Sequence, residues 1–210
     1  MPQASPSLET VPQLLSAGEF RCLIGGALTP ASSGRTFPTI NPATQEKLAD
    51  VPACDAVDVQ NAVEAAQAAF ASWKRLTPAE RAAYCRRFAE RLRARAETYA
   101  LLDALDLGSP RRAMRNDVAS AASLLDWYAG LAPELKGETI PASAQTLNVT
   151  VREPFGVVGR ITPFNHPLLF AARIAAPLVA GNTLVLKPAE QTPLSALEMA
   201  HDVKEVFPPG

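Results

Sequence analysis

Hydrophobic positions follow two different periods along the chain, and the change falls near residue 146. Between about residues 55 and 130, apolar side chains recur every three or four residues. Val59, Val63, Ala66 and Phe70 are spaced in this way, which places them on one face of a helix. From Thr146 to Val151, apolar and polar residues alternate, which indicates a half-exposed strand. The pattern predicts a helical layer followed by a region that contains strands.

Start and stop signals divide the helical layer into four helices. Asp55 is the expected cap of the first helix. The segment TPAE at 77–80 combines a capping hydroxyl, a first-turn proline and a returning carboxylate, so the second helix begins there. The third helix runs from about Ala96 to Leu107 and stops at Gly108. Ser109-Pro110 starts the fourth helix.

The final third predicts alternating strands and helices. Val157 to Ile161 forms a strand, Pro167 to Ala180 a mostly apolar helix, and Thr183 to Leu186 a second strand that is apolar after its first residue. Thr192-Pro193 then caps a last helix that reaches about Val206. This order is typical of a parallel sheet. The expected fold class is α/β, with N-terminal hairpins and a helical layer leading into an incomplete Rossmann-like parallel sheet.

The N-terminal part is rich in turn residues. Short apolar pieces at 35–40 and 47–51 lie between them, as in strands and hairpins. Residues before about 20 are rich in Pro and Ser and resemble a leader. The expected units are a flexible leader at 1–19, N-terminal strands with a four-helix layer at 20–145, a strand of a hairpin at 146–155, and two βα units at 156–210.

Composition and charge exclude several classes of protein. The chain has 210 residues, 48% of them hydrophobic and 20% charged, as in an ordinary soluble protein. The net charge of −1 provides no basic excess for nucleic acid or an anionic membrane. The N-terminus has no secretory pattern, and the longest apolar stretch is too short to span a bilayer and contains Arg173 and Pro177. A soluble, cytoplasmic protein is expected.

The cysteines do not indicate a disulfide framework. Cys22, Cys54 and Cys85 are odd in number and far apart in sequence, which argues against a set of disulfides and against a zinc site, so no metal is expected. Cys85 lies in an Arg-rich helical segment, where a lowered pKa is conceivable. A partly buried structural cysteine is the favoured interpretation.

The first candidate for chemistry is the segment ITPFNHP at 161–167, between a strand and a helix. Ligands of open α/β sheets bind at the carboxyl ends of the strands. The amide of Asn165 can donate to a developing oxyanion there, a contribution of about 3 kcal/mol to the barrier. From the residues alone, a simple turn is the favoured interpretation. His166 is interpreted as a turn or pocket-wall residue, because no partner for it lies nearby in the sequence.

The second candidate is LKPAE at 186–190, after the next strand. Lys187 and Glu190 can both reach the hydroxyls of a ribose, and a carboxylate would repel a 2′-phosphate. A solvated ion pair is the simpler interpretation, and without other knowledge it is favoured. The chain contains neither GxGxxG nor GxxxxGK[ST], so the standard phosphate loops are not indicated.

Taken together, residues 156–210 resemble the opening of the cofactor domain of the aldehyde dehydrogenase superfamily. PFN, AGN and LKPAEQTP at these separations form a specific set. Upstream, INPATQEKLADVP, DVQNAVEAAQAAFASWK and TPAERA also resemble that family, so the likeness covers nearly everything after about residue 20. It implies an NAD-dependent (or NADP-dependent) oxidation of a small aldehyde by a homo-oligomeric enzyme.

The resemblance also implies roles for single residues. Asn165 matches the amide of the oxyanion hole, and Lys187 and Glu190 match the pair that holds the adenosine ribose, with the acid favouring NAD over NADP. Cofactor contacts are expected from Ile161, Thr162, Pro163, Phe164, Asn165, Lys187, Ala189 and Glu190. The strand at 146–151 matches part of the hairpin through which subunits of the family associate.

The chain departs from the family pattern in two ways. Many members carry a Lys at the position of Ile174, whereas here Arg173 precedes it, which puts a proton-relay role there in doubt. The family's phosphate-side glycine segment, general-base Glu and nucleophilic Cys match positions beyond Gly210. We therefore expect an N-terminal portion that is inactive alone. The alternatives are a truncated, non-catalytic binding or assembly module and, less favoured, an unrelated nucleotide-binding domain.

Overall fold

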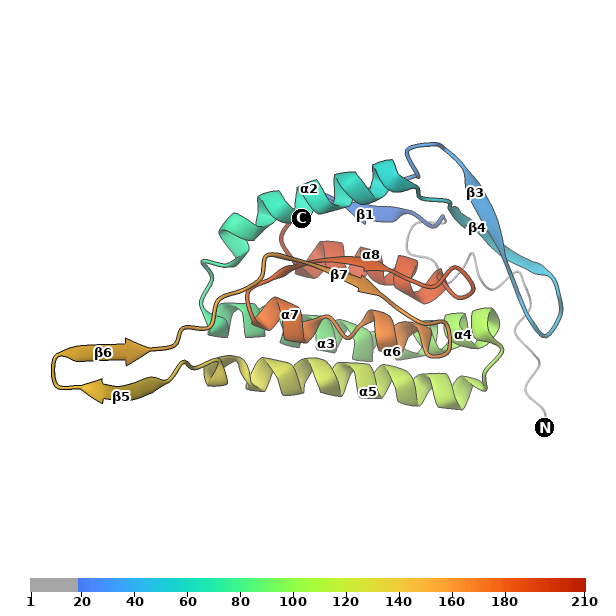
Figure 1. The fold of residues 1–210 in the computed structure, drawn as a ribbon. Helices are drawn as coiled ribbons and strands as arrows, with labels where there is room; N and C mark the ends of the chain where they lie inside the picture. Colours follow the sequence, from blue (N-terminus) through green and yellow to red (C-terminus); the bar gives the residue numbers. More distant parts are fainter. Residues whose placement is uncertain (1–18) are drawn as a thin grey trace.

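The computed structural model describes residues 19–210, so nearly all of the expected leader lies outside the described part. Its strands form pairs (Figure 1). Three pairs are antiparallel and the fourth is parallel. They are β1 (Cys22–Ile24) with β2 (Ala27–Thr29), β3 (Thr36–Ile40) with β4 (Lys47–Pro52), β5 (Thr139–Ser143) with β6 (Thr146–Val149), and β7 (Val157–Ile161) with β8 (Thr183–Lys187).

The four expected helices are present. They are α2 (Ala56–Trp73), α3 (Pro78–Ala94), α4 (Ala96–Leu107) and α5 (Arg111–Gly130). Asp55 and Thr77 each accept a backbone N–H and form complete capping boxes. Gly108 ends α4 with a φ of 82°, a conformation that glycine adopts without strain. The capping signals in the sequence therefore fix these boundaries correctly.

The buried face of α2 differs from the expected one. Val59 and Val63 are exposed, whereas Asp58, Ala66 and Trp73 are buried. The side of α2 that faces the sheet is rich in alanine, and small side chains let a helix backbone approach closely. The hydroxyl of Thr183 in β8 donates to the carbonyl of Ala66 at 2.9 Å. Close packing on the sheet thus selects the small alanines for the buried face and leaves the larger valines exposed.

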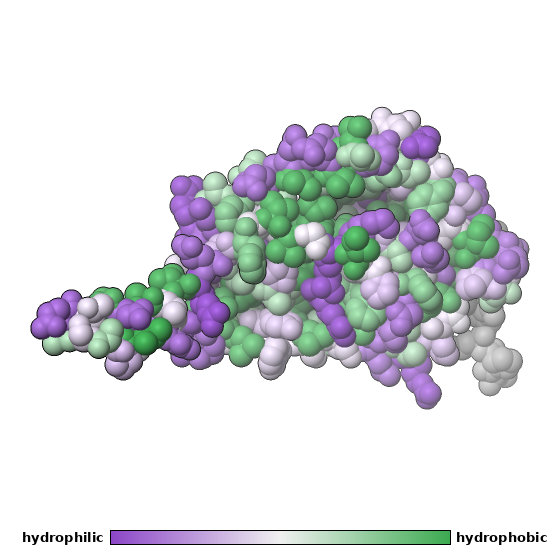
Figure 2. Space-filling model, in the orientation of Figure 1, coloured by the Kyte–Doolittle hydropathy of each residue, from purple (hydrophilic) through white to green (hydrophobic). Residues whose placement is uncertain are grey.

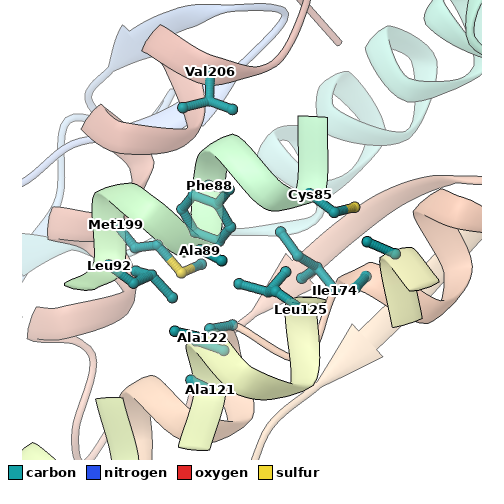
Figure 3. Close-up of a cluster of buried hydrophobic side chains, with 14 of the residues drawn as sticks. Cys85, Phe88, Ala89, Leu92, Ala121, Ala122, Leu125, Ile174, Met199 and Val206 are labelled. Carbon is teal, nitrogen blue, oxygen red and sulfur yellow. The ribbon is translucent and has the colours of Figure 1, made fainter. Parts of the chain in front are cut away.

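The main core lies between α3, α5 and the last third of the chain (Figure 3). Phe88 and Leu92 of α3 and Leu125 of α5 are fully buried, and Ile174 and Met199 join the same cluster. Leu184 and Leu186 of β8 pack against it from the sheet. Segments far apart in sequence therefore share one hydrophobic core.

The single helix expected at 167–180 is wrong. The structure has two short helices, α6 (Pro167–Ala171) and α7 (Ala175–Val179), with a break between them. Pro177 has no N–H and cannot donate to the carbonyl of Arg173, which prevents a continuous helix. Proline is tolerated in the first turn of α7 because that N–H would have no helical partner.

The last helix, α8 (Leu194–Val206), begins where expected but has a different cap. Asp106 of α4 accepts the backbone N–H of Leu194 at 3.0 Å. The hydroxyl of Thr192 instead donates to the carbonyl of Phe164 at 2.9 Å. The helix start is therefore held from another element rather than by its own sequence.

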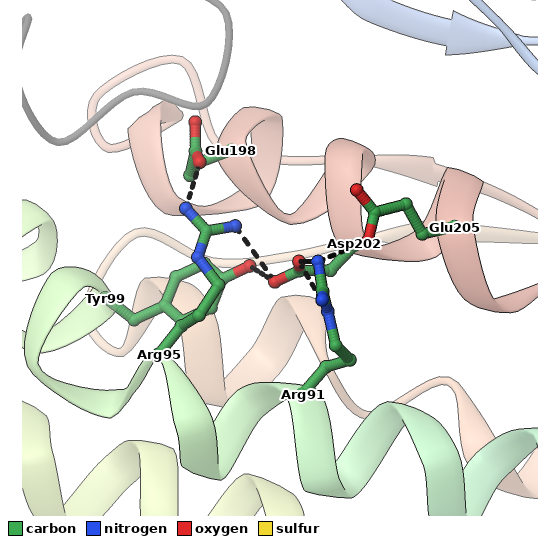
Figure 4. A network of polar contacts seen from close by, with 6 residues as sticks. All are labelled: Arg91, Arg95, Tyr99, Glu198, Asp202 and Glu205. Atoms are coloured by element: carbon green, nitrogen blue, oxygen red, sulfur yellow. Dashed lines mark hydrogen bonds and ion pairs between the residues drawn. The ribbon is translucent and has the colours of Figure 1, made fainter.

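A network of charged side chains joins α8 to α3 and α4 (Figure 4). The buried carboxylate of Asp202 accepts from Arg91 at 2.9 Å, from Arg95 at 3.1 Å and from the Tyr99 hydroxyl at 2.5 Å. Arg95 also pairs with Glu198. A buried carboxylate with three donors is well compensated for the loss of water.

The hairpin β5–β6 projects from the body of the molecule (Figure 1), and its residues are exposed. It follows the short 3₁₀ helix η1 (Ala132–Glu134). The strand expected from Thr146 is therefore one half of a hairpin, although it ends at Val149 rather than Val151. Within residues 19–210, no helix combines the length and the hydrophobicity needed to cross a bilayer.

Candidate active site

The two candidate segments meet at one edge of the parallel pair β7–β8. Ile161 and Lys187 are register partners at the carboxyl ends of their strands. The N–H of Thr162 donates to the carbonyl of Lys187 at 3.1 Å, and Thr192 holds the carbonyl of Phe164. The structure therefore places the starts of the two candidate segments side by side, although Ile161 and Lys187 are 26 positions apart in sequence.

Most of these residues are open to solvent. Ile161 is 80% exposed and Phe164 is 53% exposed. Thr162 is buried and Ala189 is half-buried. The exposed members are Ile161, Pro163, Phe164, Asn165, Lys187 and Glu190. They lie after the carboxyl ends of the two strands, the position that open α/β sheets use for binding.

Two aspartates from the helical layer hold the loop that carries Asn165. The ring Nδ1 of His166 lies 2.7 Å from Oδ2 of Asp117 in α5. The expectation that His166 lacks a partner is therefore wrong, because its partner comes from 49 positions away. The N–H of Leu168 donates to Oδ2 of Asp103 in α4 at 3.1 Å. Asn165 thus projects from a loop that is fixed immediately after it.

Neither aspartate could be found by reading the sequence locally. Asp103 is fully buried, and burial raises its pKa to about 7 against the lowering effect of the Ser195 hydroxyl and the Leu168 N–H. Asp117 and Asp103 stand in helices that were expected only as a layer. The only local signal is Asp103 itself, a charged residue in the mostly apolar stretch at 100–107. That signal does not identify the group to which the carboxylate binds.

A cavity of about 470 Å³ lies beside β8, between α2 and α8. Its lining is largely apolar, with Lys187 and Glu190 at the sheet edge and Asp58 in α2. Figure 2 shows hydrophobic surface gathered in the hollow beneath α2. An apolar hollow with a carboxylate and an ammonium group at one end suits a ligand that has a flat apolar part and hydroxyl groups.

The three cysteines lie in two different environments. Cys85 is fully buried in the main core, where reagents cannot reach it, so it is a structural residue; burial also raises its pKa to about 12. Cys22 and Cys54, far apart in sequence, lie with their sulfur atoms 3.0 Å apart. Both thiols are free, and their contact could not be foreseen from their separation in sequence.

Position 174, where many members of the family carry a lysine, has no polar side chain in this chain. Ile174 is buried in the main core. Arg173 is exposed and lies over the ring of Phe170 at 4.7 Å from its centroid. Arg173 therefore does not replace a lysine at position 174.

The chain matches known proteins over nearly its whole length. A family model described as the aldehyde dehydrogenase family matches residues 28–210. The chain is 46% identical over 186 residues to the aldehyde dehydrogenase tropH of Talaromyces stipitatus, covering 87% of this chain and 36% of that protein. It is 39% identical to the NADP/NAD-dependent aldehyde dehydrogenase PuuC of Escherichia coli, covering 89% of this chain and 39% of that protein. The chain thus spans less than half the length of these relatives.

Solved structures agree with the sequence comparison. The NAD⁺ complex of an aldehyde dehydrogenase from Bacillus cereus superposes with a TM-score of 0.91 at 41% identity, covering 95% of this chain and 42% of that one. HpcC from Thermus thermophilus gives a TM-score of 0.91 at 39% identity, covering 96% of this chain and 40% of that one. The fold, the order of its motifs and the sequence agree, and the chain belongs to the aldehyde dehydrogenase family.

Proposed function

We propose that this chain provides the cofactor-binding and oxyanion-stabilising part of an enzyme that oxidises an aldehyde to a carboxylic acid with NAD. The observation that carries the proposal is the meeting of 161–165 and 187–190 at one edge of a parallel sheet. The relatives described above, which are aldehyde dehydrogenases and include an NAD⁺ complex, support both the reaction and the cofactor.

Each segment has its own proposed role. The amide of Asn165 donates to the oxygen of the aldehyde as it gains negative charge, and the fixed loop behind it keeps the donor oriented. Thr162, Pro163 and Phe164 flank the nicotinamide end of the cofactor, and Ile161 lies at the start of this segment. When bound, NAD supplies the hydride acceptor.

The adenosine end of the cofactor is proposed to lie at the second segment. Lys187 donates to a ribose hydroxyl and Glu190 accepts from one, while Ala189 leaves room beside them. The carboxylate of Glu190 disfavours the 2′-phosphate of NADP through like charge. NAD is therefore the proposed cofactor, with NADP a weaker one.

The nucleophile and the general base of the reaction are proposed to lie outside residues 19–210. Cys85 is inert by burial, and Cys22 and Cys54 lie beside β1 and α2 rather than at the loop of Asn165. We propose that 20–145 and 156–210 together form part of a cofactor domain. Residues 146–155 belong to a hairpin through which copies of the protein associate in the cytoplasm.

The second candidate function is a non-catalytic assembly module. The hairpin β5–β6 favours it, because Ile140, Leu147 and Val149 are exposed there and pack against no core cluster. A module of this kind would associate through the hairpin without binding NAD.

Calorimetric titration of the 210-residue chain separates the two functions. The chain should bind NAD, and Glu190→Gln should weaken that binding about tenfold, as expected for the loss of a charged hydrogen bond. The same change should improve the ratio of NADP to NAD affinity. Glu138→Gln, an exposed acid at the base of the hairpin, is the matched control and should change neither value.

The chain should also form no NADH when mixed with NAD and a small aldehyde. Unchanged NAD and NADP affinities in Glu190→Gln would contradict the proposed ribose contact. An absence of NAD binding, together with self-association that disappears when the hairpin is shortened, would favour the assembly module.

A further inference from the structure

Cys22 and Cys54 form a pair of thiols in direct contact. Cys22 belongs to β1, and Cys54 lies between β4 and the cap of α2. Their sulfur atoms are 3.0 Å apart, and both thiols are free. A disulfide requires about 2.05 Å between the sulfur atoms, so bond formation needs a shift of about 1 Å.

The backbone on both sides of the pair is held in place. β1 is paired with β2, with Cys22 opposite Thr29. On the other side, Asp58 accepts from the N–H of Asp55 at 3.0 Å as part of the α2 capping box. Asp58 also accepts from the N–H and the hydroxyl of Ser32, at 2.8 and 2.6 Å. The two thiols therefore meet because their supporting segments are fixed.

The pair is open to small molecules, in contrast to the third cysteine. Cys54 is exposed and Cys22 is partly exposed, and both line the cavity beside α2. Cys85 is fully buried in the main core. The chain thus contains its own internal control for reaction with a small reagent.

We propose that Cys22 and Cys54 form a reversible oxidation site whose substrates are hydroperoxides. The Cys54 thiolate attacks one peroxide oxygen, the O–O bond breaks, and the other oxygen takes up a proton and leaves as water or an alcohol. The Cys54 sulfenic acid is then attacked by the Cys22 thiolate, and its hydroxyl leaves with a proton as water. Two thiols and one hydroperoxide give a disulfide, an alcohol (or water) and water.

The surroundings decide which thiol attacks first. Burial raises the pKa of Cys22 to about 12, and the negative charge of Asp58 adds to this. Burial also raises the pKa of Cys54, but the contact with the Cys22 thiol opposes this rise. Asp55, which pairs with Arg35 at 3.6 Å, and Asp58 both disfavour the Cys54 thiolate. Lys187 and Glu190 line the same cavity. Because Cys54 is the more exposed of the two thiols, Cys54 is the attacking thiol and Cys22 the resolving one.

The bond would join β1 to the start of α2. Both elements form the wall of the cavity whose far edge carries Lys187 and Glu190. A reducing cytoplasm keeps such a pair as thiols, and the disulfide appears only under oxidant. Oxidation would therefore tether one wall of the proposed cofactor cavity without touching the sheet edge itself.

The test uses the reduced 210-residue chain with hydrogen peroxide as the probe. After alkylation of the remaining thiols, peptide mapping by mass spectrometry should show Cys22 joined to Cys54 within one chain and Cys85 alkylated. Dithiothreitol should restore both thiols. The rate of cross-linking should rise about tenfold from pH 7 to pH 8, because the pKa of the attacking thiol lies above this range and its thiolate becomes about ten times more abundant. The thermal midpoint of the oxidised chain should rise by several degrees.

Variants separate this site from general thiol reactivity. Cys22→Ser and Cys54→Ser should each abolish the intramolecular cross-link, and Cys85→Ala should retain it. Conversion of Cys54 to a sulfinic acid while Cys22 stays a free thiol would overturn the proposal, as would consumption of Cys85 at the same rate. These readouts do not depend on NAD, so they stand or fall separately from the proposed function.

Discussion

At the scale of single residues, two buried carboxylates support the loop and helix around Asn165. Asp103 accepts the N–H of Leu168, and Asp106 accepts the N–H of Leu194 and the hydroxyl of Thr39. Burial raises the pKa of Asp103 to about 7 and that of Asp106 to about 6. Each aspartate holds the start of a helix that lies far from it in sequence.

Asp103 makes the stability of the fold depend on pH. Its folded pKa of about 7 lies above the ordinary value of 3.8, so the folded state retains a proton that the unfolded state has lost. The stability that this proton provides is complete below pH 4 and is lost as the pH rises through 7. A shift of this size corresponds to about 4 kcal/mol in the free energy of unfolding.

Asp103→Asn should remove most of this loss, because a neutral amide replaces the carboxyl. Urea unfolding between pH 4.5 and pH 8 measures how the free energy of unfolding changes with pH in each protein. The variant keeps a smaller decline from Asp106, which titrates in the same direction. Asp50→Asn, an exposed control, should follow the unmodified chain. A free energy of unfolding that rises over this range in the unmodified chain would contradict the assignment to Asp103.

The sequence singles out candidate ligand-facing residues but not the residues that hold their loop. Asn165, Lys187 and Glu190 stand in short motifs directly after strands, where a ligand site is expected. Asp103 and Asp117 reach the same loop from 65 and 49 positions away. Their role depends on how the helices pack on the sheet, which no local pattern contains.

At the scale of elements, the capping boxes of α2 and α3 were predicted correctly, whereas the cap of α8 was not. Strand β7 lies where the sequence predicts it. The starts of α2 and α3 also lie where predicted, because each start carries its own hydrogen-bond donors and acceptors. The predicted face of α2 was right for Ala66 but wrong for Val59 and Val63, because close approach to β8 favours alanine over valine there. The helix at 167–180 was wrong, because the effect of Pro177 outweighs a continuous apolar pattern.

The attachment of α8 to α3 and α4 rests on Asp202. Asp202→Asn should lower the free energy of unfolding by about 3 kcal/mol, because Arg91, Arg95 and Tyr99 lose a buried charged acceptor. Glu205→Gln is the matched control: Glu205 also pairs with Arg91 but is mostly exposed, so its loss should cost less than about 1 kcal/mol.

Denaturant unfolding of both variants at neutral pH gives the comparison. Equal effects of the two substitutions would show that the network acts as a surface feature. A much larger effect of Asp202→Asn would show that it holds α8 in place.

At the scale of the whole molecule, the two halves of the sheet face are covered unequally. α2 packs on the end where Thr183 meets Ala66, while Ile161 at the other end is 80% exposed. Phe155, just before β7, is 99% exposed. Parallel strands are usually covered on both faces and flanked by further strands. The α/β class follows from the order of patterns, but the extent of cover does not, since it depends on elements that contact the sheet from elsewhere.

This unequal cover should appear in hydrogen exchange of the isolated chain. Amides of β7 and β8 should exchange faster than those of α3 between Arg81 and Leu92, because the pair has few neighbours whereas α3 lies in the main core. Equal protection of the two regions in a monomeric sample would contradict this expectation.

The projecting hairpin has a consequence for the covalent continuity of the chain. Its turn at Ala144 and Gln145 joins β5 to β6 at a point that is exposed on all sides. The segments before and after it share the main core, since α3 packs against α7 and α8 and α5 packs against α7. A nick at this tip would break the polypeptide without removing a core contact. The chain could therefore be supplied as two polypeptides that reassemble, and the tip is the natural place to insert a reporter.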